Sequence, residues 1–129
     1  MIDVGRVRRS LKLGRGGAPP RFGKLGDFEA ADSVFARARG LMFRRSVKRP
    51  LLFTFQRESQ AECAIHAFFV FFPFDAVYLD GKKRVVDVYH AIRPFTPLIV
   101  PKKRAKYLVE APAGWAKKRR IRAGDRLYF

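Results

Sequence analysis

The stretch HAFFVFFPFDAVYLDGKKRVVDVYH, from His66 to His90, decides the fold of this 129-residue chain. Its first part, Ala67–Phe74, is apolar apart from a proline and contains five phenylalanines. A helix that spans a membrane needs about 20 apolar residues, so this run is too short to be one. Apolar residues on both faces are typical of a covered central strand, and we predict one over Ala64–Phe72 that ends at Pro73.

The second part of the stretch predicts an antiparallel hairpin, Ala76–Leu79 and Arg84–Ile92, in which Asp80-Gly81 suits a type I′ turn. The same reasoning predicts further strands over Val4–Leu13, Phe28–Ala31, Pro50–Phe55, Lys106–Glu110 and Arg126–Phe129, and short helices over Asp32–Arg39 and Ala113–Arg120. We therefore predict a mostly-β protein, a small β-sandwich or barrel-like single domain with one or two short helices. Residues 1–26 would form a basic N-terminal arm or hairpin, and residues 27–129 the single mostly-β domain.

Charge is the abnormal feature of the composition. The chain has 28 lysines and arginines against 11 acids, a formal net charge of +17. Of these basic residues 22 lie in three segments, 1–26, 37–49 and 102–122, which contain few acids. Such an excess repels itself unless an anionic partner neutralises it, and nucleic acid and anionic membranes are the usual partners. No long amphipathic helix with a basic face is present, so we do not expect a membrane partner.

The leading hypothesis is a non-catalytic RNA-binding protein that is associated with the ribosome or another ribonucleoprotein. Ribosomal RNA and neighbouring ribosomal proteins would be its partners, and basic side chains would neutralise RNA phosphates. No RNP aromatic motif, KH loop or zinc knuckle is present, so recognition would follow phosphate positions, and no DNA sequence specificity is expected. The predicted nucleic-acid-binding residues are Arg6, Arg8, Arg9, Lys12, Arg15, Arg21, Arg37, Arg44, Arg45, Lys48, Arg49, Lys102, Lys103, Arg104, Lys117, Lys118, Arg119 and Arg120.

Candidate chemical groups are few, and they predict no catalytic residue, metal site or cofactor. Asp75 is an acid beside a buried segment, where bonding to backbone amides at a bend is its commoner role. His66 and His90 lack the spacing of metal ligands. With Asp75 they form the alternative hypothesis, a β-sandwich module with a pocket for an anionic metabolite or a sugar. Cys63, the only cysteine, is expected to be a buried structural thiol, and the absence of disulfides favours a cytoplasmic location.

Several motifs occur in the order seen in a known family. They are ARGLMFR (38–44), LLFTF (51–55), IHAFFVFFPFDAVYLD (65–80), KRVVDV (83–88), AKYLVEAPAG (105–114) and AGDRLYF (123–129). Over about Phe28–Phe129 the chain resembles an archaeal-type member of the domain of unknown function 192 family. The resemblance implies a mostly-β, sandwich-like fold and no established activity. Many bacterial members have a W-M-K-N-T version of the aromatic segment where this chain has HAFFVFF.

Overall fold

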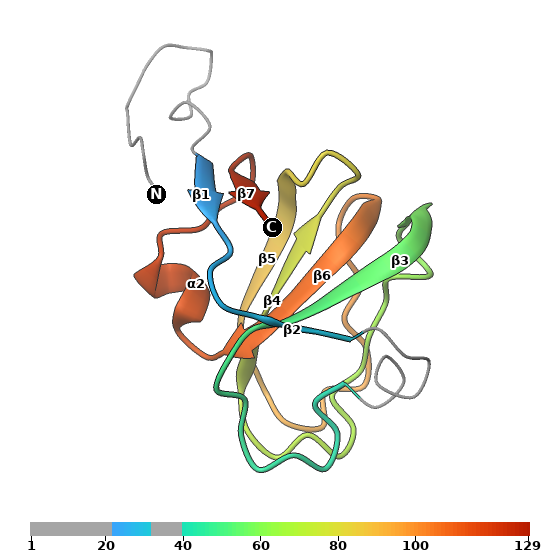
Figure 1. Cartoon of the computed structure of the whole chain (residues 1–129). Helices are drawn as coiled ribbons and strands as arrows, with labels where there is room; N and C mark the ends of the chain where they lie inside the picture. The colour runs from blue at the N-terminus through green and yellow to red at the C-terminus, as the bar shows by residue number, and fades with distance from the viewer. Residues whose placement is uncertain (1–21, 32–39) are drawn as a thin grey trace.

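A five-stranded sheet in the order β2-β3-β6-β4-β5 forms the body of the molecule, and β1 and β7 form a separate parallel pair (Figure 1). The computed structural model describes residues 22–31 and 40–129, so the predicted strand in 4–13 and helix over 32–39 lie outside the described residues. Neither sheet closes into a barrel, which confirms a mostly-β, sandwich-like single domain. The described elements are β1 (Phe22–Lys24), β2 (Glu29–Ala30), β3 (Leu51–Ser59), β4 (Phe74–Leu79), β5 (Val85–Ile92), β6 (Ala105–Pro112), α2 (Trp115–Lys118) and β7 (Arg126–Tyr128).

Strand β4 is the most deeply buried element, because it has a neighbour on each edge and a packed layer on each face. All six of its residues are buried. It pairs antiparallel with β5 on one edge and with β6 on the other. The predicted strands of the hairpin are therefore confirmed, as are those that correspond to β2, β3, β6 and β7 and the helical turn at α2.

The predicted central strand over Ala64–Phe72 is wrong, because this segment is a loop. It makes one isolated bridge, from Ile65 to Ile99, and it turns where the Val70 amide donates to the Ala67 carbonyl. Phe69 has a φ of 59°, which breaks an extended conformation. The apolar run is therefore not the central strand. That strand is β4, which begins at Phe74, directly after Pro73.

The predicted type I′ turn at Asp80-Gly81 is also wrong. The Lys83 amide donates to the Asp80 carbonyl at 2.9 Å, and the residue with positive φ is Lys83, at 65°, rather than Gly81. The Asp80 carboxylate accepts hydrogen bonds from the amides of Lys82 and Arg84 at 2.9 and 3.0 Å. This carboxylate therefore stabilises a turn that is longer than the two-residue turn of a type I′ hairpin.

Two hydrophobic clusters cover the two faces of the main sheet. On one face, Phe53, Tyr78 and Leu108 pack beneath the loops that carry Leu41 and Val70. On the other face the sheet packs against the helix and the β1–β7 pair, through a cluster formed by Leu25, Leu52, Val77, Leu79, Val85, Val109, Ala111, Ala116, Ile121 and Leu127. A cavity lies on the first face, where irregular loops rather than a second sheet cover the strands.

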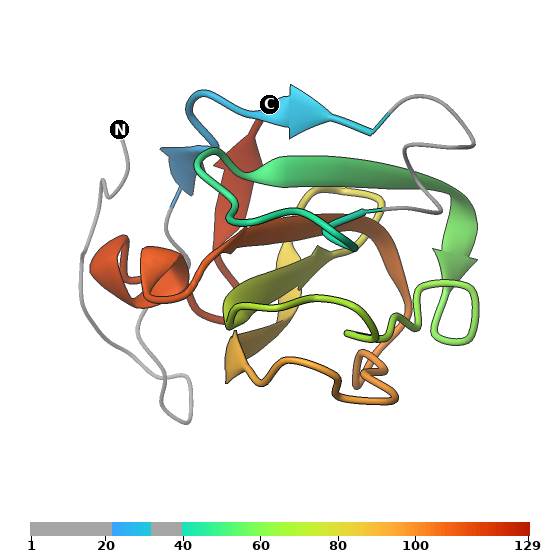
Figure 2. The same ribbon diagram turned by 90° about the horizontal axis from the view of Figure 1, so that it is seen from below.

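The β1–β7 pair brings two distant parts of the chain together (Figure 2). Gly23 pairs with Leu127, and the neighbouring Leu25 is 1% exposed. Arg119, which follows α2, donates to the Leu25 carbonyl at 2.6 Å and lies over the Trp115 ring. Strand β1 and Leu25 fall within residues 22–26 of the predicted arm. These contacts show that this part of the arm packs against the body of the domain.

Candidate functional site

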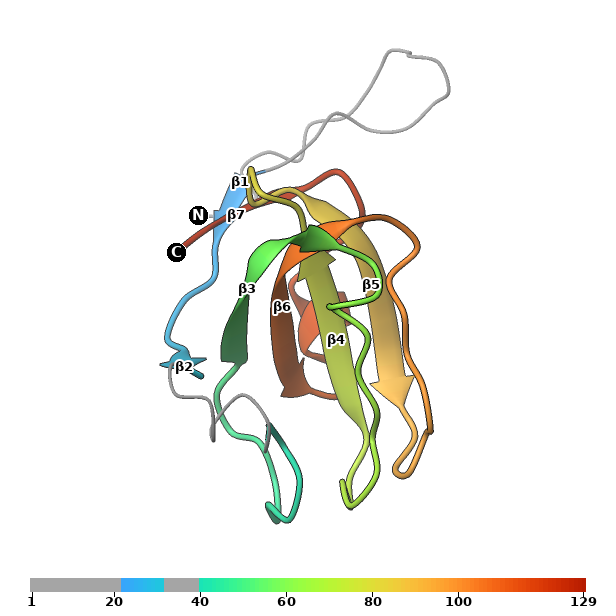
Figure 3. The ribbon, with the colours of Figure 1, turned by 90° about the vertical axis from the view of Figure 1, so that its right-hand side faces the viewer.

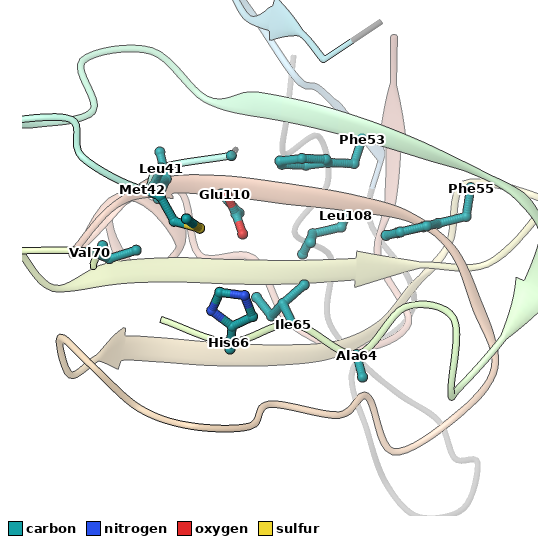
Figure 4. Close-up of a pocket in the computed structure, with 11 residues that line it drawn as sticks. Leu41, Met42, Phe53, Phe55, Ala64, Ile65, His66, Val70, Leu108 and Glu110 are labelled. Atoms are coloured by element: carbon teal, nitrogen blue, oxygen red, sulfur yellow. The ribbon is translucent and has the colours of Figure 1, made fainter. Parts of the chain in front are cut away.

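A cavity of about 210 Å³ lies between the main sheet and the loops on its first face (Figure 4). Strands β3 and β6 supply one wall, and the loops before β3 and before β4 supply the others. Among the described lining residues, only Glu110 and His66 have polar side chains. The lining residues are Gly40, Leu41, Met42, Phe53, Phe55, Ala64, Ile65, His66, Val70, Leu108 and Glu110. This volume lies below the usual range of ligand pockets, about 300–1,000 Å³, so the cavity can hold only a small ligand beside its polar side chains.

Glu110 is the polar centre of this cavity. The residue is 5% exposed, and burial raises the pKa of its carboxyl group from 4.5 to about 8, although Arg44 opposes part of that rise. Its Oε1 atom has no hydrogen-bond partner among the described residues, and neither does the buried hydroxyl of Tyr78. Figure 4 shows the Glu110 carboxyl group directed into the hollow between Met42 and Leu108. An unpartnered buried acid is costly, so this group is suited to a ligand that can hydrogen-bond to it.

The segment Gly40–Arg44 forms the rim of the cavity and is held by its own arginine. Arg44 Nε donates to the Gly40 carbonyl at 3.2 Å, and its Nη1 atom donates to Glu29 Oε1 at 3.2 Å. Gly40 has a φ of 51°, and a Cβ atom there would lie 3.5 Å from Glu110 Oε1. That distance is an ordinary van der Waals contact, so it is the left-handed backbone that favours glycine at this position.

The structure separates the three residues predicted to share a ligand pocket. His66 lines the cavity, and its Nδ1 atom accepts a hydrogen bond from the Phe68 amide at 3.1 Å. Asp75 is fully buried and accepts hydrogen bonds from the amides of Ala91 and Ala116, each at 2.9 Å, so it fastens β4 to β5 and to α2. His90 is exposed on β5 and is not among the lining residues.

Cys63 is a buried free thiol, as expected. Its Sγ atom donates to the Ala105 carbonyl at 3.2 Å, and burial raises its pKa to about 11. A thiol that remains protonated at neutral pH is a poor nucleophile, which fits a structural role.

The described acids are mostly engaged within the molecule. Four of them pair with arginines: Glu29 with Arg44, Asp27 with Arg49, Glu62 with Arg57 and Asp80 with Arg84. Four others accept hydrogen bonds from backbone amides: Glu58, Asp75, Asp87 and Asp125. Few carboxylates are left to neutralise the surface cations.

The predicted nucleic-acid-binding residues fall into three groups. Those outside the described residues are Arg6, Arg8, Arg9, Lys12, Arg15, Arg21 and Arg37. Those with side chains bonded to other parts of the molecule are Arg44, Arg49, Arg104 and Arg119. Those that are exposed and form no ion pair within the described residues are Arg45, Lys48, Lys102, Lys103, Lys117, Lys118 and Arg120.

The exposed cations do not gather at one point. Lys102 and Lys103 lie just before β6, whereas Lys117, Lys118 and Arg120 follow its end. An eight-residue strand separates the two groups by about 25 Å along the sheet. A partner that contacted both groups would have to extend along or around the molecule.

Glu110 was not among the site residues predicted from the sequence. The feature that could have indicated it is the presence of an acid within the apolar strand residues Tyr107–Ala111. An acid on a buried strand face is rare unless it is paired or functional.

No helix in residues 22–31 and 40–129 is both long enough and apolar enough to cross a membrane. In the same part of the chain, no three histidine, cysteine, aspartate or glutamate side chains gather as a metal site would require.

The sequence of this chain matches one known family, and its fold matches two solved structures. Residues 21–129 match the DUF192 model, described as "Uncharacterized ACR". The UPF0127 protein of Pyrococcus abyssi is 38% identical over 102 residues, covering 79% of this chain and 85% of that protein. The UPF0127 protein TK1120 of Thermococcus kodakarensis is 36% identical over 100 residues, which cover 78% of this chain but only 62% of the longer relative.

Two crystal structures share the fold. A Sinorhizobium meliloti protein proposed to be a transcription regulator superposes with a TM-score of 0.70 at 22% identity, covering 77% of this chain and 78% of the other. A protein of unknown function from Novosphingobium aromaticivorans gives a TM-score of 0.68 at 19% identity, with coverage of 83% and 74%. At these identities the likeness extends to the fold alone. The sequence matches go further, and they show that this chain belongs to the domain of unknown function 192 family, as an archaeal-type member.

Proposed function

We propose that this chain is a non-catalytic binder of structured RNA, with ribosomal RNA and neighbouring ribosomal proteins as its partners. One observation carries the proposal: several exposed cations form no ion pair within the described residues, because most acids of these residues already have other partners. With a formal net charge of +17, the chain gains most from a partner that carries many negative charges.

The distribution of the cations supports a polynucleotide rather than a small anion. Lys102 and Lys103 lie at one end of β6, and Lys117 and Lys118 lie beyond the other. A small anion could reach only one of these groups, whereas phosphates recur along a nucleic acid backbone. Recognition would then depend on the spacing of phosphates and on the shape of the RNA.

A salt titration of RNA binding tests the proposal. Fluorescence anisotropy of a labelled ribosomal RNA fragment would be followed from about 50 mM to about 200 mM salt with the full chain. We expect affinity to fall steeply with salt, and the double variant Lys102→Gln/Lys103→Gln to lower the logarithmic slope by about 1.4 to 1.8.

The control removes the same formal charge from arginines that already have acidic partners, as Arg57→Gln/Arg84→Gln. It should change the slope less than the lysine variant. No detectable binding at the lowest salt, or equal effects of the two double variants, would refute the proposal. Sedimentation of a cell lysate through a gradient is a second test, in which we expect the protein to migrate with ribosomal subunits.

The second candidate function is binding of a small ligand in the cavity, and it is favoured by the Glu110 Oε1 atom, which has no hydrogen-bond partner among the described residues. Arg44 is bonded to Gly40 and Glu29 and does not line the cavity, so the described lining residues include no lysine or arginine that could hold an anionic metabolite. A ligand with a hydroxyl or amino donor, such as a sugar or a small amine, suits the acid better.

A thermal-shift screen would test this second candidate with small polyols, amines and carboxylates. Polyols or amines should raise the melting temperature of the wild type and not that of Glu110→Ala. A shift from carboxylates alone, or an equal shift in Glu110→Ala, would contradict it. Glu62→Ala, which removes an acid that is paired with Arg57 and is not among the lining residues, is the control.

A further inference from the structure

Four exposed phenylalanines form one cluster, here called the aromatic tip. Phe43, Phe69, Phe71 and Phe95 are 59%, 49%, 58% and 46% exposed. Phe43 and Phe69 stack at 5.1 Å with an interplanar angle of 20°. Phe95 makes edge contacts with Phe69 at 6.2 Å and with Phe71 at 5.4 Å. The rings form one continuous apolar surface rather than scattered exposed residues.

The aromatic tip is built from three loops that meet at one end of the main sheet (Figure 3). Strands β3 and β4 begin at this end, and β5 ends there, as the pairing of Phe74 with both Ile92 and Pro112 requires. The loops are residues 40–50, 66–73 and 93–98. The Phe43 amide donates to the Phe69 carbonyl at 2.8 Å, so two of the loops are bonded to each other.

The backbone of the aromatic tip is strained. Phe43, Phe69 and Phe95 have φ values of 64°, 59° and 63°, in the left-handed region that bulky residues avoid. Such strain persists only where the surrounding structure imposes it, and it tends to occur at binding sites. Here it holds apolar rings that are about half exposed at the surface of the molecule.

Charge around the aromatic tip indicates the kind of partner. The three loops contain no acid, and Arg45, Lys48 and Arg93 are exposed within them. A second copy of this chain would bring the same cations together, so self-association is disfavoured. The partner must offer both negative charge and flat or apolar groups.

We propose that the aromatic tip stacks on unpaired bases of the bound RNA, while Arg45, Lys48 and Arg93 contact the flanking phosphates. This inference rests on the proposed RNA-binding function. An anionic bilayer could bind both the rings and the cations of the aromatic tip. It could not reach Lys102 and Lys103 at the same time, because they lie at the opposite end of the sheet. A nucleic acid supplies both phosphates and ring faces, and the near-parallel Phe43–Phe69 stack can be extended by a base.

The test compares three RNA probes of the same length at one salt concentration: a single strand, a duplex and an abasic single strand. The wild type should bind the normal single strand most tightly, because only this probe offers free base faces. The double variant Phe43→Leu/Phe69→Leu keeps the apolar surface but lacks rings. It should bind the single strand about fivefold to a hundredfold more weakly and leave binding of the abasic strand unchanged.

Phe43→Tyr/Phe69→Tyr retains the rings and should bind like the wild type. Phe71→Leu gives an independent measurement if the double variant does not fold. If the wild type binds normal and abasic strands equally and the leucine variants change nothing, the stacking inference fails while the RNA-binding proposal stands. If no probe is bound, both fail.

Two further measurements separate the other partners. Co-sedimentation with anionic phospholipid vesicles, in the absence of single-strand binding, would overturn the inference in favour of a membrane. A monomer–dimer equilibrium in analytical ultracentrifugation that the leucine variants abolish would overturn it in favour of a second copy.

Discussion

Replacing Glu110 by glutamine should make the protein more stable at alkaline pH. Glutamine has nearly the shape of the protonated acid but cannot ionise. In the folded protein burial raises the Glu110 pKa from 4.5 to about 8. The folded state therefore holds a proton that the unfolded state releases, and the wild type loses stability as pH rises from about 4.5 to about 8.

The magnitude follows from the two pKa values. A shift from 4.5 to about 8 corresponds to a loss of up to about 5 kcal/mol once the acid is ionised in both states. At pH 7, where the folded acid is still mostly protonated, the loss is about 3 kcal/mol. Glu110→Gln should therefore unfold at nearly the same denaturant concentration as the wild type at pH 5, and at a clearly higher one at pH 8.

The assay is guanidinium unfolding of wild type and Glu110→Gln from pH 5 to pH 9, in buffers of equal ionic strength. Glu62→Gln serves as the control, because Glu62 is a partly exposed acid paired with Arg57 and should contribute less than about 1 kcal/mol. A difference between wild type and Glu110→Gln that stays constant with pH would refute the reasoning, as would a variant that is less stable than the wild type at pH 8.

The other predictions concern groups around the same sheet. Tyr78→Phe removes a buried hydroxyl that has no partner among the described residues, so the free energy of unfolding should stay the same or rise by up to about 1 kcal/mol; a clear fall in the melting temperature would contradict this. Asp75→Asn can accept only one of the two amide hydrogen bonds, so chemical denaturation should show a loss of about 2–3 kcal/mol, and an unchanged midpoint would contradict this bracing role. Gly40→Ala and Gly114→Ala should each cost about 1–2 kcal/mol, because both glycines have positive φ. Only the methyl group at position 40 lies beside Glu110, so only that variant should shift the pH dependence of stability.

Most of the strands could be predicted from the sequence, because their alternating or apolar patterns are strong and local. The exceptions were β1, which lies within the predicted basic arm, and the most apolar segment of the chain. Ala64–Phe72 is a loop, while the central strand β4 begins at Phe74 and contains Asp75. An acid ordinarily argues against a central strand, and only the fold reveals the two backbone amides that compensate its burial.

The candidate site was less predictable, since it depends on contacts between distant segments. His66 was expected in a pocket and does line the cavity, but Glu110, its polar centre, comes from a strand 44 residues later in the sequence. The excess of basic residues was visible from composition alone. Which of those residues remain unpaired could be learned only from the positions of the acids.

The parallel pairing of Phe22–Lys24 with Arg126–Tyr128 has a consequence for synthesis on the ribosome. The first of these segments leaves the exit tunnel long before its partner exists, since about a hundred residues must be added in between. Until then Leu25 cannot enter its buried place, and the face of the sheet beneath it stays uncovered. The nascent chain can therefore complete this side of its core only after β7 has been synthesised and released from the tunnel, and until then its uncovered apolar surface is exposed to aggregation.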